Sequence, residues 1–178
     1  MRALLRDATG DMHEALHRAP VFDRLASGSI DWADYRQIMR MLAGFHFGIE
    51  AVRAEGARAL AVTAENPRLA LLSADLEGLG YDWSPRTHDE TDPDRAVGCL
   101  YVVEGSVLGG RVLHRQLNPL FGARREGRRF FKGPPSAGAR WRETCQALDR
   151  YQPGDPSRVV AGAVAAFDHF AQGLEAEG

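Results

Sequence analysis

The chain has 178 residues, of which 44% are hydrophobic, and we expect it to fold as one domain spanning residues 1–178. Its 22 basic and 24 acidic residues give a formal net charge of −2, which argues against a general nucleic-acid binder, because such proteins need a strong surplus of positive charge. The charged N-terminus, together with the lack of a later stretch near the roughly 20 apolar residues of a membrane span, predicts neither a signal peptide nor a membrane segment.

Apolar residues recur three and four positions apart along most of the chain, which predicts about six amphipathic helices. Pro20 ends the first, and an Asp or Asn stands before the second, third, fourth and sixth, as helix caps do. The predicted helices cover residues 4–19, 32–52, 67–78, 93–118, 136–148 and 156–170. The stretch between Leu120 and Pro135 is rich in Gly, Pro and Arg and predicts a surface loop. Because no convincing strand pattern appears, the sequence favours an all-α helical bundle.

The helix predicted over residues 93–118 contains YVVEGSVLGG, residues 101–110, with glycines where bulky core residues are expected. Each glycine inside a helix costs roughly 0.5–1 kcal/mol relative to alanine. At about 100° per residue, Gly98, Gly105 and Gly109 fall on one narrow stripe, with Ser106 and Gly110 beside it. This shallow trough lets a backbone approach either another helix or a flat ligand, and the spacing alone leaves both interpretations open.

A second candidate site lies in DMHEALH, residues 11–17. His13 sits beside the apolar stripe of its helix, where a neutral imidazole can ligate iron or zinc, or can simply border the core. His17 lies one turn later on the same face. HEALH also matches the HExxH pattern of zinc metalloproteases, with Glu14 as the catalytic glutamate, but no third-ligand motif accompanies it.

The remaining polar residues give less specific patterns. A basic run surrounds Phe130 and Phe131, and it could hold the carboxylates of a ligand, dock an acidic protein, or be solvated. Cys99 and Cys145 lie far apart with no metal-binding or disulfide spacing, so we expect reduced thiols and a cytoplasmic protein. The basic run consists of Arg124, Arg125, Arg128, Arg129 and Lys132, and the histidines without a distinctive spacing are His46, His88, His114 and His169.

These segments together resemble the heme oxygenase family over nearly the whole chain. LLRDATGDMHEALHRAPVF resembles the family's N-terminal helix, in which a threonine, here Thr9, precedes the iron-binding histidine by four positions. LYVVEGSVLGGRVL is similar to the family's glycine-bearing distal helix, about 90 residues further on. RRFFKGP, Trp141 and RVVAGAVAAFDHFAQGL resemble its later segments.

The resemblance implies that heme lies between the first helix and the glycine-bearing helix. It implies an enzyme that uses O₂ and electrons from a redox donor to open the heme ring, giving biliverdin, CO and ferrous iron. The site residues that it implies are His13 as proximal iron ligand, Gly105, Ser106, Gly109 and Gly110 on the distal side, Arg6, Lys132 and Arg142 for the heme propionates, and Phe167 as a wall of the pocket.

The resemblance also bears on partners. A ferredoxin or a flavin reductase is the expected electron donor, and the bilin product could supply a bilin-binding photoreceptor, unless the purpose is iron acquisition. Two other functions stay open at this point: a non-catalytic heme-binding or trafficking protein of the same fold, and a helical interaction domain without a cofactor.

Two positions depart from the family's pattern. Animal-type members have a distal aspartate where this sequence has Ser106, so the proton-delivering water must be held by Ser106, by backbone, or by Glu104. Many members have an acidic residue where His17 stands. A carboxylate at that position would strengthen electron donation by the iron-binding imidazole through a hydrogen bond.

Overall fold

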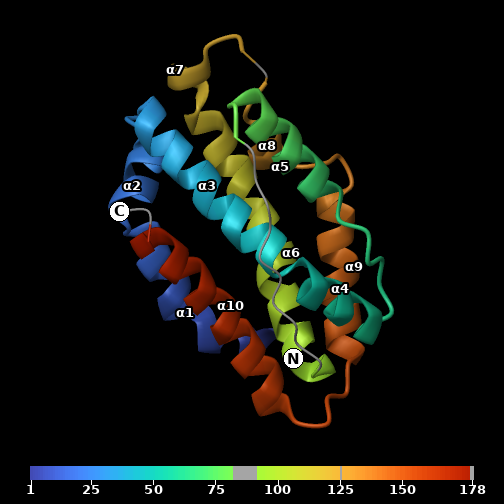
Figure 1. Ribbon diagram of the computed structural model, residues 1–178. Coiled ribbons are helices and arrows are strands. Elements are labelled where there is room, and N and C mark those ends of the chain that lie inside the picture. Colours follow the sequence, from blue (N-terminus) through green and yellow to red (C-terminus); the bar gives the residue numbers. More distant parts are fainter. Residues whose placement is uncertain (82–91, 125, 177–178) are drawn as a thin grey trace.

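The computed structural model describes residues 1–81, 92–124 and 126–176, and their regular structure is entirely helical (Figure 1). This confirms the predicted all-α fold. The helices are α1 (Arg2–His17), α2 (Pro20–Ser27), α3 (Trp32–Gly48), α4 (Glu50–Ala59), α5 (Pro67–Gly78), α6 (Pro93–Gln116), α7 (Asn118–Phe121), α8 (Arg129–Lys132), α9 (Ala137–Arg150) and α10 (Pro156–Ala176).

Side-chain caps confirm four of the predicted helix starts. The carboxylate or amide oxygens of Asp31, Asn66, Asp92 and Asp155 each accept a hydrogen bond from a backbone N–H of the helix that follows, at 2.9, 3.2, 3.0 and 2.9 Å. Such a bond satisfies one of the donors that a helix leaves free in its first turn. These residues therefore determine where α3, α5, α6 and α10 begin.

The described residues form ten helices, against about six expected. Pro20 begins α2 as well as ending α1, because proline fits the first position of a helix. The helix expected over residues 32–52 is interrupted at Ile49, which separates α3 from α4. The surface loop expected between Leu120 and Pro135 is wrong in part, because Phe130 and Phe131 are buried there on α8.

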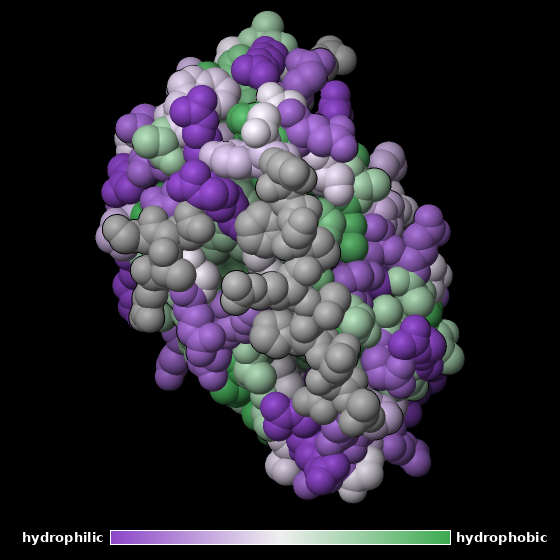
Figure 2. Space-filling model, in the orientation of Figure 1, coloured by the Kyte–Doolittle hydropathy of each residue, from purple (hydrophilic) through white to green (hydrophobic). Residues whose placement is uncertain are grey.

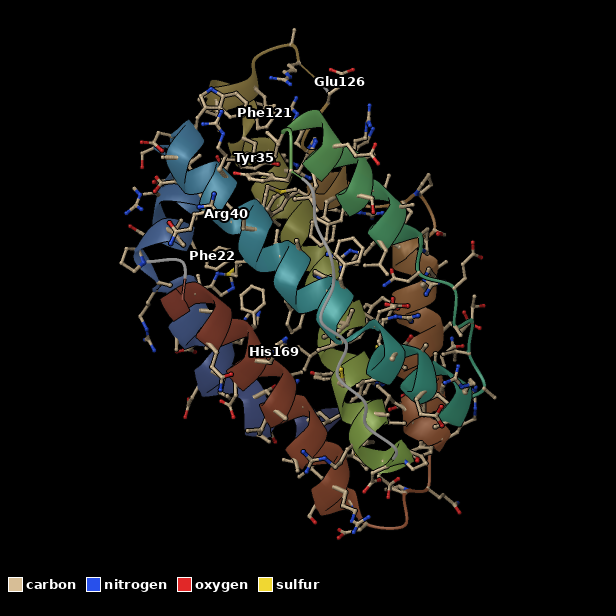
Figure 3. All side chains as sticks on the ribbon, in the orientation of Figure 1. Phe22, Tyr35, Arg40, Phe121, Glu126 and His169 are labelled. Carbon is tan, nitrogen blue, oxygen red and sulfur yellow. The ribbon has the colours of Figure 1, made fainter. Side chains whose placement is uncertain are left out.

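Two apolar clusters form most of the core. One contains Tyr35, Phe121 and Phe131, with Tyr35 and Phe121 labelled near one end of the bundle in Figure 3. The Tyr35 and Phe121 rings pack edge to face, with 5.0 Å between their centroids. The other cluster joins α1, α4, α6, α9 and α10 around Leu5 and Leu100. Among the residues drawn in colour on the face in Figure 2, most are polar, and apolar ones show mainly between them.

Helix α6 lies at the centre of the bundle, packed against α4, α8, α9 and α10 (Figure 1). Glycines allow its closest contact, with α10. A Cβ on Gly98 would lie 1.9 Å from the carbonyl oxygen of Val159, and a Cβ on Gly162 would lie 1.9 Å from that of Arg95. Side chains at these two positions would force the helices apart.

The expectation that no stretch has the length of a membrane span is wrong for α6. Among the described residues, this helix alone is long and apolar enough to cross a membrane by length and composition. Its position at the centre of the bundle is also that of a core helix, so length and composition do not distinguish the two.

Candidate functional site

A cavity of about 380 Å³ opens between α1, α3, α6 and α10. Its volume lies in the range of small-molecule sites, and its walls are mainly apolar and aromatic, as such sites usually are. Phe22, labelled in Figure 3, stacks on Phe170 with 6.0 Å between the ring centroids, and both rings line the cavity. The other aromatic lining residues are Phe45, Tyr101, Phe130, Phe131, Trp141 and Phe167.

Helix α1 supplies one wall of the cavity. Arg6, Thr9, His13 and His17 all line it, because residues three and four apart lie on one face of a helix. The Thr9 hydroxyl donates a hydrogen bond within its own helix, to the Leu5 carbonyl at 2.8 Å. Along this wall the histidines are therefore the side chains available to a metal.

The His13 imidazole is favourably prepared as a metal ligand. Burial lowers its pKa, and the neighbouring His17 lowers it further, so the neutral ring with a free lone pair predominates at pH 7. The two histidine rings lie 4.6 Å apart, and the Phe167 ring meets His13 edge to face at 6.4 Å. These neighbours limit the orientations that the imidazole can take.

Helix α6 supplies a second wall, where Gly105, Ser106, Gly109 and Gly110 all line the cavity. A Cβ on Gly109 would meet nothing within 4 Å, so this glycine borders open space. At Gly105 and Gly110 a Cβ would lie 3.3 Å from the Trp141 ring and from the Phe131 carbonyl oxygen. The two interpretations of the glycine trough therefore apply to different positions: Gly98 serves helix packing, and Gly109 leaves the cavity free.

Arg68 is a functional candidate that sequence reasoning missed. It lies in the first turn of α5, lines the cavity, and is 6% exposed. Its Nη1 donates to the Ser106 hydroxyl at 2.9 Å and to the Val103 carbonyl at 3.2 Å, while its guanidinium lies over the Phe130 ring at 4.4 Å. Burial lowers the pKa of Arg68 to about 10, partly opposed by the charge of Glu104, so the group stays charged at pH 7.

His46 is the second residue that the sequence did not single out. It lies on α3, lines the cavity and is 3% exposed. Burial keeps its pKa well below the ordinary value, with the charges of Arg68 and Arg53 adding to the effect. His46 is therefore neutral at pH 7, and its ring packs edge to face on Phe130 at 4.9 Å.

Glu104 does not face the cavity, which excludes one of the three ways of holding a distal water. Its carboxylate accepts hydrogen bonds from Arg53 at 3.4 Å and from Arg140 at 3.2 Å. These arginines lie on α4 and α9, and neither of them lines the cavity. Ser106 and the helix backbone are the two options left.

The basic residues proposed for propionates lie in different places. Arg6 lines the cavity, and its side chain is 77% exposed, with Asp7 3.5 Å away, so it stands at the rim. Lys132 and Arg142 are exposed and are not among the lining residues. In the basic run, Arg128 donates to Asn118 at 2.8 Å, whereas Arg125 lies outside the described residues, as does His88.

The zinc metalloprotease interpretation of HEALH gains no support. Within residues 1–81, 92–124 and 126–176, no three His, Cys, Asp or Glu side chains lie close enough to hold a metal ion. A zincin site needs a third protein ligand beside its two histidines.

Comparison with known proteins gives one clear match. No family model matches the chain. A protein named heme oxygenase from Xanthomonas campestris pv. campestris (strain 8004) is 30% identical over 158 residues, which is 86% of this chain and 96% of that protein.

Proposed function

Because this chain belongs to the heme oxygenase family, we propose that it binds heme in the cavity between α1 and α6 and opens the heme ring to biliverdin. One observation carries the proposal: a neutral imidazole, His13, and a stretch of bare helix backbone at Gly109 lie on two walls of the same cavity. A planar ligand with a metal at its centre needs both a donor atom and room beside it.

The residues present fit a heme. The aromatic walls suit the porphyrin, and Arg6 at the rim suits a propionate. Gly109 leaves space that any side chain would fill. Heme, when bound, supplies the iron that activates O₂ and is itself the substrate, which is converted to biliverdin, CO and ferrous iron.

The chain's own residues bind, orient and supply hydrogen bonds. His13 would hold the iron through its free lone pair, and the Phe167 ring limits the orientations of the imidazole. The Ser106 hydroxyl donates to the Val103 carbonyl at 2.8 Å and accepts from Arg68, which leaves it one lone pair for a water molecule. Ser106 thus takes the part of the distal carboxylate, as a neutral acceptor.

The remaining elements of the proposal rest on the family. Electrons come from a ferredoxin or a flavin reductase, and the bilin goes to a photoreceptor or is a by-product of iron release. We also propose a cytoplasmic location, which two free cysteines, Cys99 and Cys145, support.

Titration with hemin tests the proposal. The wild type is expected to give the absorption spectrum of histidine-ligated ferric heme, and His13→Ala is expected to lose it and to regain it on addition of imidazole. His114→Ala is the matched control, because His114 does not line the cavity. With an electron donor and O₂, the wild type should yield a bilin.

Two outcomes would contradict the proposal in different ways. An unchanged spectrum in His13→Ala would remove the ligand assignment. Hemin that binds but is recovered intact after incubation with reductant and O₂ would instead indicate a heme-binding protein without the activity.

A further inference from the structure

Arg68 is a buried cation that forms no salt bridge within the described part of the chain. The Glu104 carboxylate acts on it through its charge but is itself bonded to Arg53 and Arg140. Among the described residues, the hydrogen-bond partners of Arg68 are a hydroxyl, Ser106, and a carbonyl, Val103. Its Nε is buried and has no partner among those residues. A buried charge is costly unless it is paired, so this arrangement favours an anion beside the guanidinium.

The cavity is where such an anion would lie. Arg68, Ser106 and His46 all line it. His46 is neutral, so it neither offsets the positive charge of Arg68 nor adds to it. The other arginine of the cavity, Arg6, is largely exposed at the rim, where water screens it. Arg68 therefore makes one region of an otherwise apolar pocket strongly attractive to anions.

This region is separate from the histidine wall. Arg68 comes from α5, and His13 comes from α1, and these helices lie on opposite sides of the bundle in Figure 1. A ligand that fills the cavity touches both. One wall then offers a neutral lone pair, and the other offers positive charge and hydrogen-bond donors.

We propose that Arg68, positioned by Ser106 and Phe130, forms an anion site inside the cavity that stabilises a small anionic ligand of the heme iron. The inference rests on the proposed function, because it needs heme in this cavity. It assigns Arg68 a positioning and charge-stabilising part that an exposed arginine could not fill. A cation in low dielectric acts on an anion more strongly than one in water.

Ligand titrations of the ferric hemin complex test this with one anionic and one neutral probe, azide and imidazole. Arg68→Met is expected to lower the azide affinity about tenfold or more, which corresponds to about 1.4 kcal/mol, and to leave the imidazole affinity within about threefold. Arg68→Lys should recover part of the azide affinity, because it keeps the charge but not the planar fork. Ser106→Ala should give a smaller loss than Arg68→Met.

Arg128→Met is the matched control, since Arg128 is also a buried arginine but does not line the cavity. It should leave both affinities unchanged. Equal losses of azide and imidazole in Arg68→Met would show that Arg68 only shapes the pocket, and a loss of hemin affinity itself would show that it pairs with a propionate. Either result overturns the inference.

The two hypotheses fail separately. If wild-type protein binds no hemin, the proposed function is wrong and the inference falls with it. If hemin binds through His13 but azide affinity does not depend on the charge at position 68, the anion site alone is wrong. Circular dichroism on each variant establishes that the fold is intact.

Discussion

The two uses of glycine in α6 can be separated by making the same substitution twice. In Gly98→Ala the new Cβ would lie 1.9 Å from the Val159 oxygen and 2.6 Å from the Ala163 nitrogen, both of them backbone atoms of α10. A normal contact needs more than 3 Å, so the two helices must move apart by over 1 Å. In Gly109→Ala the Cβ meets nothing within 4 Å.

The magnitudes follow from helix propensity and overpacking. Replacing glycine by alanine inside a helix raises the free energy of unfolding by roughly 0.5–1 kcal/mol, and this is the only effect expected for Gly109→Ala. Overpacking costs about 1–3 kcal/mol, and Gly98→Ala belongs at the upper end because backbone cannot rotate aside as a side chain can. We expect Gly98→Ala to be less stable than Gly109→Ala by about 2–3 kcal/mol, or roughly 4–12 °C in Tm for a chain of this length.

Urea unfolding followed by circular dichroism, in the absence of heme, measures this difference directly. The absence of heme matters because ligand binding would add its own stabilisation. A Gly98→Ala variant as stable as Gly109→Ala would refute the reasoning, since it would mean that close approach of α6 and α10 does not require glycine at position 98.

Two further predictions concern the cavity and the segment beside it. Gly109→Leu should abolish hemin binding by filling the cavity while leaving unfolding cooperative, whereas loss of cooperativity would mean that Gly109 serves packing. Asp75 accepts a hydrogen bond from the Phe130 N–H at 2.8 Å, and burial raises its pKa to about 6. Because this folded-state pKa lies above the ordinary aspartate pKa of 3.8, ionisation disfavours the folded state, and the contribution of Asp75 to stability is lost as pH rises from about 4 through 6. Asp75→Asn should therefore become more stable relative to the wild type over that range in urea unfolding at several pH values, and a constant difference between the two would contradict the assigned pKa.

Local signals predicted the helices that depend on local chemistry. The caps at Asp31, Asn66 and Asp92 act within three residues of themselves, so their effect can be read from the sequence. The same is not true of α8, where Phe130 and Phe131 make a charged and glycine-rich segment fold inward because a core is available to receive their rings. Long-range packing of this kind overrides local composition.

The site divides in the same way. His13 and Gly109 were identifiable because each departs from what its helix would otherwise need. Arg68 was not identifiable, because its place in the cavity depends on a hydrogen bond to Ser106, which is 38 residues further along the chain. One local signal existed. Arg68 lies in the first turn of its helix, where a positive charge is unfavourable because it opposes the helix dipole, so another interaction is expected to hold it there.

The ion pairs of Glu104 have a mechanical consequence for the cavity. The glycines on the cavity face of α6 offer no side chains to neighbouring helices, and the Ser106 hydroxyl is held there by Arg68. The Glu104 carboxylate is held by ion pairs with Arg53 of α4 and Arg140 of α9. Successive residues are about 100° apart around a helix, so fixing position 104 also fixes the direction in which position 106 points. The rotation of the distal wall about the helix axis thus depends in part on ion pairs between residues that do not line the cavity.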